Sequence, residues 1–136
     1  MSKSTDKIHK AFEGVELFVL ADGDYAAPTS HWLLDTWKVQ WLELLEELPY
    51  SKRHDCDDFA FEYKIAVQHQ HAESEFPDDG FAVGVCFYLV GGDRERGHAI
   101  NWALTEDVAL IFIEPQSGEQ IQLTDAEKAT IFFVYG

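Results

Sequence analysis

Two hydrophobic patterns follow one another along the chain, and their order limits the folds open to it. In residues 29–49 apolar side chains recur every three or four residues, which is typical of one face of a helix. After residue 80 the pattern changes to short runs of β-branched and aromatic residues separated by turn residues. These runs cover residues 81–90, 97–104, 108–114, 119–123 and 131–136. Helices followed by strands predict the α+β class, with helices packed on an antiparallel sheet.

A second helix is predicted to begin in the stretch DCDDFAFEYK, residues 55–64, where Asp55 can cap the first turn. Its first residue is Cys56, one of only two cysteines, and the apolar stripe of the helix starts there. The partial positive charge at the amino end of a helix favours a thiolate, so Cys56 is a candidate nucleophile. The alternative is a small residue packed under the helix start. Cys86 lies within an apolar strand pattern and is interpreted as a core residue.

The stretch GHAINWALTEDVALIFIEPQ, residues 97–116, predicts a β-hairpin. With a three-residue loop at 105–107, His98 lies directly across from Glu114, and Gln116 is the diagonal neighbour of His98. An acid beside an imidazole orients the ring and selects its tautomer. A loop of two or four residues would place Glu114 elsewhere. A purely structural pair is the other interpretation.

A cysteine, a histidine and an acid supply a nucleophile, a base and an orienting group. Strand alternation places His98 on the sheet face that carries Ile100 and Trp102. If the second helix packs on that face, Cys56 comes to the His98 end of the sheet. The meeting of the three groups therefore depends on which face the helix covers.

The motifs DCDDFA, GHAINW and FIEPQ, in this order, resemble a known family. They are similar to the papain-like, calcium-dependent cysteine protease domain at the C-terminus of Marasmius oreades agglutinin, and more distantly to the papain-like and transglutaminase-like superfamily. The resemblance covers roughly residues 30–136. It implies a papain-like fold with Cys56 as nucleophile, His98 as general base and acid, Glu114 as third member and Gln116 as an accessory polar group.

Calcium is a candidate ion, because carboxylate oxygens are its preferred ligands and the resemblance implies it. The candidate ligands are Asp57, Asp58 and Asp93. Acidic residues in a first helical turn also have a structural explanation, since they complement the helix dipole. No organic cofactor is expected. Trp41 and Trp102 are candidates for lining a substrate cleft, although such tryptophans more often belong to the core.

Charge and hydropathy restrict partners and compartment. With 25 acidic and 10 basic residues the net charge is −15, which disfavours nucleic acid and anionic membranes.

No apolar stretch approaches the roughly 20 residues of a membrane span, and the start MSKSTDKIHK lacks the apolar core of a signal peptide. A cytoplasmic protein is predicted, with non-classical secretion as the alternative. Without a linker or repeat, residues 1–136 are interpreted as one domain.

The favoured function is a thiol hydrolase, specifically a papain-like cysteine peptidase that acts on protein or peptide substrates through a Cys56, His98 and Glu114 triad. A transglutaminase, deamidase or amidase would use the same groups. A catalytically inactive acidic interaction module is the alternative from another class. A homodimer is compatible with the sequence.

Overall fold

The computed structural model of the chain describes residues 3–48, 50–51, 54–71 and 80–136. The helical elements are α1 (Lys3–Ala11), the π-helical turn η1 (Trp32–Thr36), α2 (Trp37–Leu45), α3 (Cys56–His71), the 3-10 turn η2 (Val90–Gly92) and α4 (Asp125–Lys128). The strands are β1 (Leu17–Val19), β2 (Tyr25–Ala26), β3 (Gly80–Phe81), β4 (Val83–Leu89), β5 (Gly97–Thr105), β6 (Ala109–Glu114), β7 (Glu119–Ile121) and β8 (Phe133–Tyr135).

The elements predicted from local patterns are confirmed. The helical pattern of residues 29–49 contains η1 and α2, and the second helix, α3, begins at Cys56. Five strands, β4 to β8, match the five predicted runs to within a few residues. Local periodicity succeeds here because each element buries one stripe or one face of its own side chains.

The main sheet is mixed, which corrects the expected antiparallel sheet. Its strand order is β1-β8-β4-β5-β6-β7, and β1 pairs with β8 in parallel, with Leu17 opposite Phe133. A second sheet of two strands, β2 and β3, is parallel as well. Both parallel pairs join segments that are far apart in sequence. No local pattern encodes the partner or the direction of such a pair, so the sequence interpretation missed them.

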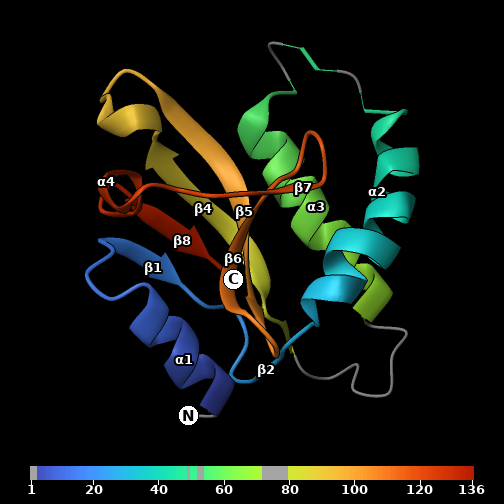
Figure 1. The fold of residues 1–136 in the computed structure, drawn as a ribbon, viewed down its shortest axis with the longest axis horizontal. Helices are drawn as coiled ribbons and strands as arrows, with labels where there is room; N and C mark the ends of the chain where they lie inside the picture. Colours follow the sequence, from blue (N-terminus) through green and yellow to red (C-terminus); the bar gives the residue numbers. More distant parts are fainter. Residues whose placement is uncertain (1–2, 49, 52–53, 72–79) are drawn as a thin grey trace.

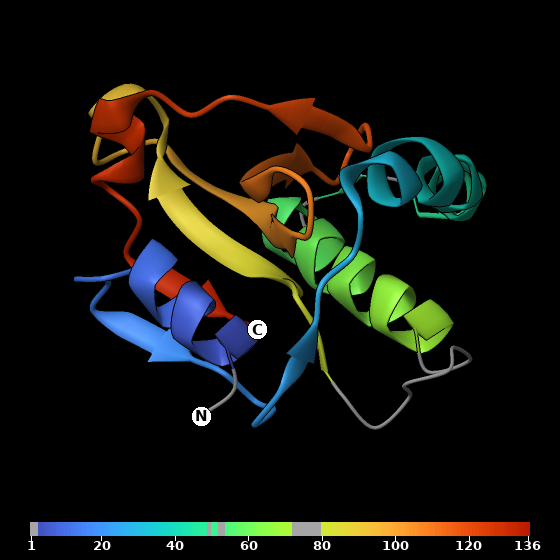
Figure 2. The same ribbon diagram turned by 60° about the horizontal axis from the view of Figure 1, so that its bottom comes forward.

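Helices lie on both faces of the main sheet (Figures 1 and 2). On one face, Ile8 of α1 and Phe12, which directly follows α1, pack with Ile100 and Trp102. On the other face, α3 packs against β4 and β5, where Ala60 joins a buried cluster with Ala99. The Cys56 helix therefore does not lie on the Ile100 and Trp102 face, so the condition under which Cys56 was placed there is not met.

Side-chain volume explains the choice of face. Ala99 and Ala103, which point toward α2 and α3, are small and allow close approach, whereas the large side chains of the opposite face interdigitate with α1. Asn101, which is fully buried, fastens α3 to the sheet: its Nδ2 donates to the carbonyl oxygens of Ala60 at 2.8 Å and Gly84 at 3.0 Å.

The β5–β6 hairpin has a different register from the expected one. Leu104 pairs with Leu110 and Thr105 with Ala109, so the loop is residues 106–108. The Thr105 hydroxyl donates to the Ala109 carbonyl and accepts from the Val108 amide, and Ala109 has a φ of 79°. The pairing is shifted by two residues, which makes His98 and Glu114 diagonal neighbours. A shift of two keeps both side chains on one face.

Candidate functional site

An imidazole–carboxylate pair lies at the end of the β5–β6 hairpin away from its loop. Nε2 of His98 donates to Oε1 of Glu114 at 2.7 Å, and each side chain is 23% exposed. In a neutral ring this bond leaves Nδ1 as the hydrogen-bond acceptor. Within the described part of the chain, the other carboxylate oxygen of Glu114, Oε2, is buried without a hydrogen-bond partner. The hydrogen bond thus orients the His98 ring. It leaves one unused hydrogen-bond acceptor on each residue, Nδ1 of His98 and Oε2 of Glu114.

The Tyr88 ring packs against the His98 ring of this pair. It is opposite His98 in the β4–β5 pairing, and the two rings meet edge to face with centroids 6.0 Å apart. Burial, together with the carboxylates of Glu127 and Glu114, raises the pKa of Tyr88 to about 12. The phenol therefore stays neutral near physiological pH and gives the His98 ring a fixed aromatic neighbour.

The two cysteines have different surroundings. Cys56 is half-buried at the start of α3 and packs beside the buried cluster that contains Ala99. Cys86 is completely buried in β4, and burial raises the pKa of its thiol. Cys56 is thus the more accessible thiol, whereas Cys86 is a core residue, as the sequence pattern indicated.

The Cys56 thiol and the His98 ring approach the same end of β5 from different sides. The Cys56 side chain packs near Ala99, which directly follows His98 in β5. Strand alternation directs Ala99 toward α3 and directs His98 toward the other face, where its ring meets Tyr88. Both residues therefore lie near the same end of β5, and their joint action stays a prediction.

The acidic candidates for calcium fall into two groups. At the start of α3, ligand atoms of Asp55, Cys56 and Asp57 lie within 4.8 Å of one another. The hydrogen bond that the protonated Asp55 carboxyl donates to Asp57, together with desolvation and the charges of Asp57 and Asp58, raises the pKa of Asp55. The side chain of Asp58 accepts from the Asp55 amide at 3.1 Å. Crowded carboxylates of this kind fit a hard cation such as calcium, and calcium binding stays a prediction.

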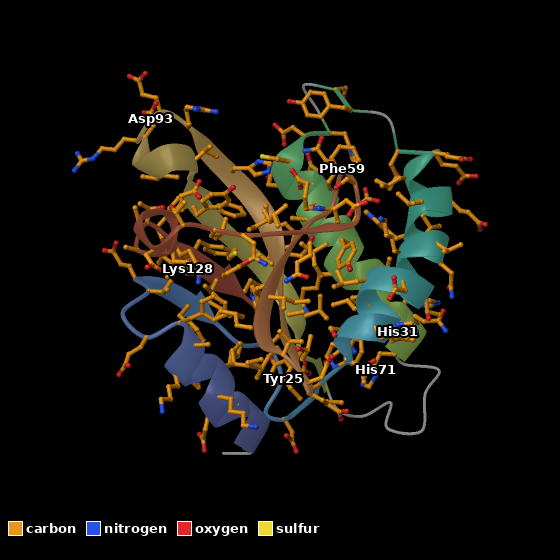
Figure 3. All side chains as sticks on the ribbon, in the orientation of Figure 1. Tyr25, His31, Phe59, His71, Asp93 and Lys128 are labelled. Carbon is orange, nitrogen blue, oxygen red and sulfur yellow. The ribbon has the colours of Figure 1, made fainter. Side chains whose placement is uncertain are left out.

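Asp93 belongs to a separate loop. It follows η2 between β4 and β5, and its Oδ1 accepts from the amide of Glu95 at 2.9 Å. Figure 3 shows Asp93 at the outer tip of that loop, apart from Phe59 in the first turn of α3. The three proposed ligands Asp57, Asp58 and Asp93 therefore come from two separate segments.

Both tryptophan candidates are buried. Trp41 is 1% exposed and its Nε1 donates to the carbonyl oxygen of Pro115 at 2.6 Å, which fixes the turn after β6 to α2. Trp102 is 0% exposed and packs edge to face on Phe12. Gln116 is exposed in the turn that follows β6. Substrate contact by Trp41 or Trp102 and an accessory role for Gln116 stay predictions.

Sequence reasoning missed a second imidazole–carboxylate pair near Cys56. Nε2 of His54 donates to Glu62 at 2.8 Å, and the His54 ring packs edge to face on Phe59. The pair forms because Ser51 and His54 are joined by an isolated β-bridge, which turns the chain back onto α3. No periodic pattern in the sequence signals this reversal, so no sequence signal could have found the pair.

The comparisons with known proteins identify the family. The family model described as the agglutinin C-terminal domain matches residues 28–120, more than half of the chain. The chain belongs to the agglutinin C-terminal family. No curated protein matches the sequence. The agglutinin part of the resemblance found in the motifs is therefore confirmed.

Solved structures show the same fold. A structure described as a PSL1a–E64 complex has a TM-score of 0.74 at 24% identity, and the match covers 98% of this chain and 49% of that one. A Polyporus squamosus lectin bound to the epitope Neu5Acα2-6Galβ1-4GlcNAc has a TM-score of 0.71 at 24% identity, covering 96% and 48%. This agglutinin-family chain thus spans about half the length of the chains that it resembles.

These findings contradict several expectations from the sequence. The fold is the mixed-sheet fold of the lectin structures and not the expected papain-like arrangement on an antiparallel sheet. The matches are to an agglutinin family and a lectin, which overturns the expected enzyme, a cysteine peptidase, and the transglutaminase, deamidase or amidase named as its enzymatic alternative. The expected partner, a protein or peptide substrate, is corrected as well, since the lectin structure holds a glycan.

Among the described residues, no helix combines the length and the apolar character that crossing a bilayer requires.

Proposed function

We propose that this agglutinin-family domain binds carbohydrate. The observation that carries the proposal is the family match over residues 28–120, and it is supported by the similarity in fold to a lectin solved with a sialylated glycan. Because the chain spans about half of that lectin, glycan binding by this half is a property to be tested on the chain itself. Fold similarity alone does not locate the site.

An aromatic group at the start of α3 offers a contact surface for a sugar ring. Tyr50 is 66% exposed, and its ring lies parallel to that of Phe59 with centroids 6.4 Å apart. The His54–Glu62 pair lies next to Phe59 and supplies polar atoms beside the aromatic face. An exposed ring flanked by hydrogen-bonding groups is the combination that a polar ligand with apolar faces requires.

Binding is tested by isothermal titration calorimetry and ligand-observed NMR with Neu5Acα2-6Galβ1-4GlcNAc, with the disaccharide that lacks sialic acid as the second ligand. We expect saturable binding by the wild type and clear weakening by Tyr50→Ala. Phe132→Ala is the matched control, because Phe132 is a 40% exposed aromatic residue outside this group, and it should leave binding unchanged. No saturable binding of either glycan at millimolar concentration would refute the proposal.

A covalent ligand site at Cys56 is the second candidate function. It is supported by the half-buried Cys56 thiol at the amino end of α3, by the oriented His98–Glu114 pair near the same end of β5, and by a similar structure that is a complex with E64. Cys56, His98, Glu114 and Gln116 are the proposed residues of this site. A cytoplasmic location and a single domain over residues 1–136 stay predictions.

Mass spectrometry of the intact protein tests the second candidate. The chain is incubated with E64, a thiol-alkylating epoxide, and separately with iodoacetamide. We expect one adduct at Cys56 in the wild type and in Cys86→Ala, and none in Cys56→Ala. Modification of both thiols at equal rates, or none at Cys56 in the folded protein, would count against a reactive site.

A further inference from the structure

A groove of about 1340 Å³ is lined by none of Tyr50, Cys56, His98 and Glu114, and it lies between α1, the segment after β2 and the loop end of the β5–β6 hairpin. Figure 1 shows α1 and this end of the hairpin at the same end of the molecule, with β2 beside them. Its walls combine cationic, acidic and apolar side chains. The ones that matter here are Lys7, Lys10 and Ala11 of α1 and Leu104, Val108 and Leu110 of the hairpin.

The lysines of α1 are unusual in so acidic a protein. Lys7, Lys10 and Ala11 are spaced by three and four residues and share one helical face, which borders the groove. Although acidic residues outnumber basic ones by 25 to 10, neither lysine forms an ion pair within the described ranges. Two ammonium groups without an ion-pair partner among the described residues therefore lie one helical turn apart at the groove.

The hairpin wall is held in place. Ser30 binds the Asp107 carboxylate through its amide at 2.8 Å and also through its hydroxyl, and the Glu106 amide donates to the Pro28 carbonyl at 2.9 Å. The hydrogen bonds of Thr105 fix the remainder of the loop. The hydrogen bonds from Ser30 lower the pKa of Asp107, so Asp107 and Glu106 are both carboxylates on the hairpin wall, whereas the two lysines lie on α1.

We propose that this groove binds an amphiphilic anion, a carboxylate or sulfonate carried on an apolar body. The acid group pairs with Lys7 and Lys10, and the apolar body lies on Leu104, Val108 and Leu110. The volume is ample for a molecule of drug-like size. The net charge of −15 disfavours anions over most of the surface, so the unpaired lysines single out this groove. This site is independent of the proposed glycan binding.

A pair of fluorescent probes with the same apolar body separates the contribution of charge from that of hydrophobic contact. 1-Anilinonaphthalene-8-sulfonate carries the anion, and N-phenyl-1-naphthylamine lacks it. We expect the double variant Lys7→Gln/Lys10→Gln to weaken the sulfonate about fivefold to tenfold and to leave the neutral probe unchanged. Lys128→Gln, a change at an exposed lysine on α4, is the matched control and should alter neither affinity. Glu106→Gln should strengthen sulfonate binding.

Ala11→Trp fills the groove from the α1 side and should abolish binding of both probes, with circular dichroism confirming that the variants are folded. The proposal is overturned if the wild type shows no saturable binding of the sulfonate. It is also overturned if the double lysine variant binds the sulfonate as tightly as Lys128→Gln does, or if Ala11→Trp retains both probes.

Discussion

Replacing Asn101 by alanine is expected to loosen the contact between α3 and the sheet. The Asn101 side chain is fully buried and gives two hydrogen bonds, to the carbonyl oxygens of Ala60 in α3 and Gly84 in β4. The alanine variant removes both donors and leaves a small cavity between the helix and the sheet. It also removes Oδ1, which has no hydrogen-bond partner among the described residues.

The magnitude follows from these three contributions. Two buried hydrogen bonds are worth about 2 kcal/mol net, and the cavity adds about 1 kcal/mol. Removal of the unpaired Oδ1 returns roughly 1 kcal/mol. We therefore expect the free energy of unfolding to fall by about 2 kcal/mol, roughly 8 °C in Tm. Urea unfolding followed by circular dichroism measures it, and the m-value should be unchanged.

Two further variants separate packing from hydrogen bonding. Asn101→Leu restores most of the volume without the donors, so it should remain destabilised. Gln120→Ala, at an exposed position of β7, should change stability by less than about 0.5 kcal/mol. A loss below that same limit in Asn101→Ala would show that the amide does not fasten α3 to the sheet.

Three other predictions concern stability. Ala109→Gly should stabilise the protein by about 1 kcal/mol, because the φ of 79° strains an alanine, and a drop in Tm would contradict this. Burial lowers the pKa of Lys64, so the folded chain releases this proton at a lower pH than the unfolded chain does. Wild-type stability relative to Lys64→Met should therefore rise as the pH approaches the ordinary lysine value of about 10.4, and parallel urea-unfolding profiles would refute the reasoning. Millimolar calcium should raise the Tm of the wild type above that in EDTA and have no effect on Asp57→Asn/Asp58→Asn, whereas equal shifts in both proteins would exclude this site.

Local sequence patterns predicted some contacts of the candidate site and missed others. The start of α3 at Cys56 and the pairing of His98 with Glu114 were predictable, because capping residues and strand alternation are local. The predicted hairpin register was two residues off, yet the contact formed because such a shift preserves the face. The His54–Glu62 pair could not be predicted from the sequence, because it depends on the bridge between Ser51 and His54, which no periodic pattern encodes.

The sequence by itself determined α2, α3 and the strands β4 to β8, together with their order, because these elements depend on residues within a few positions of one another. Tertiary structure alone decided which face of the sheet α3 covers and which strand lies beside β1. Both faces of the sheet are apolar, so hydrophobicity does not select the face that α3 covers. The close fit of Ala99 and Ala103 against the helices selects it. The strand beside β1 joins Leu17 to Phe133, a pairing specified by the packing of the whole sheet.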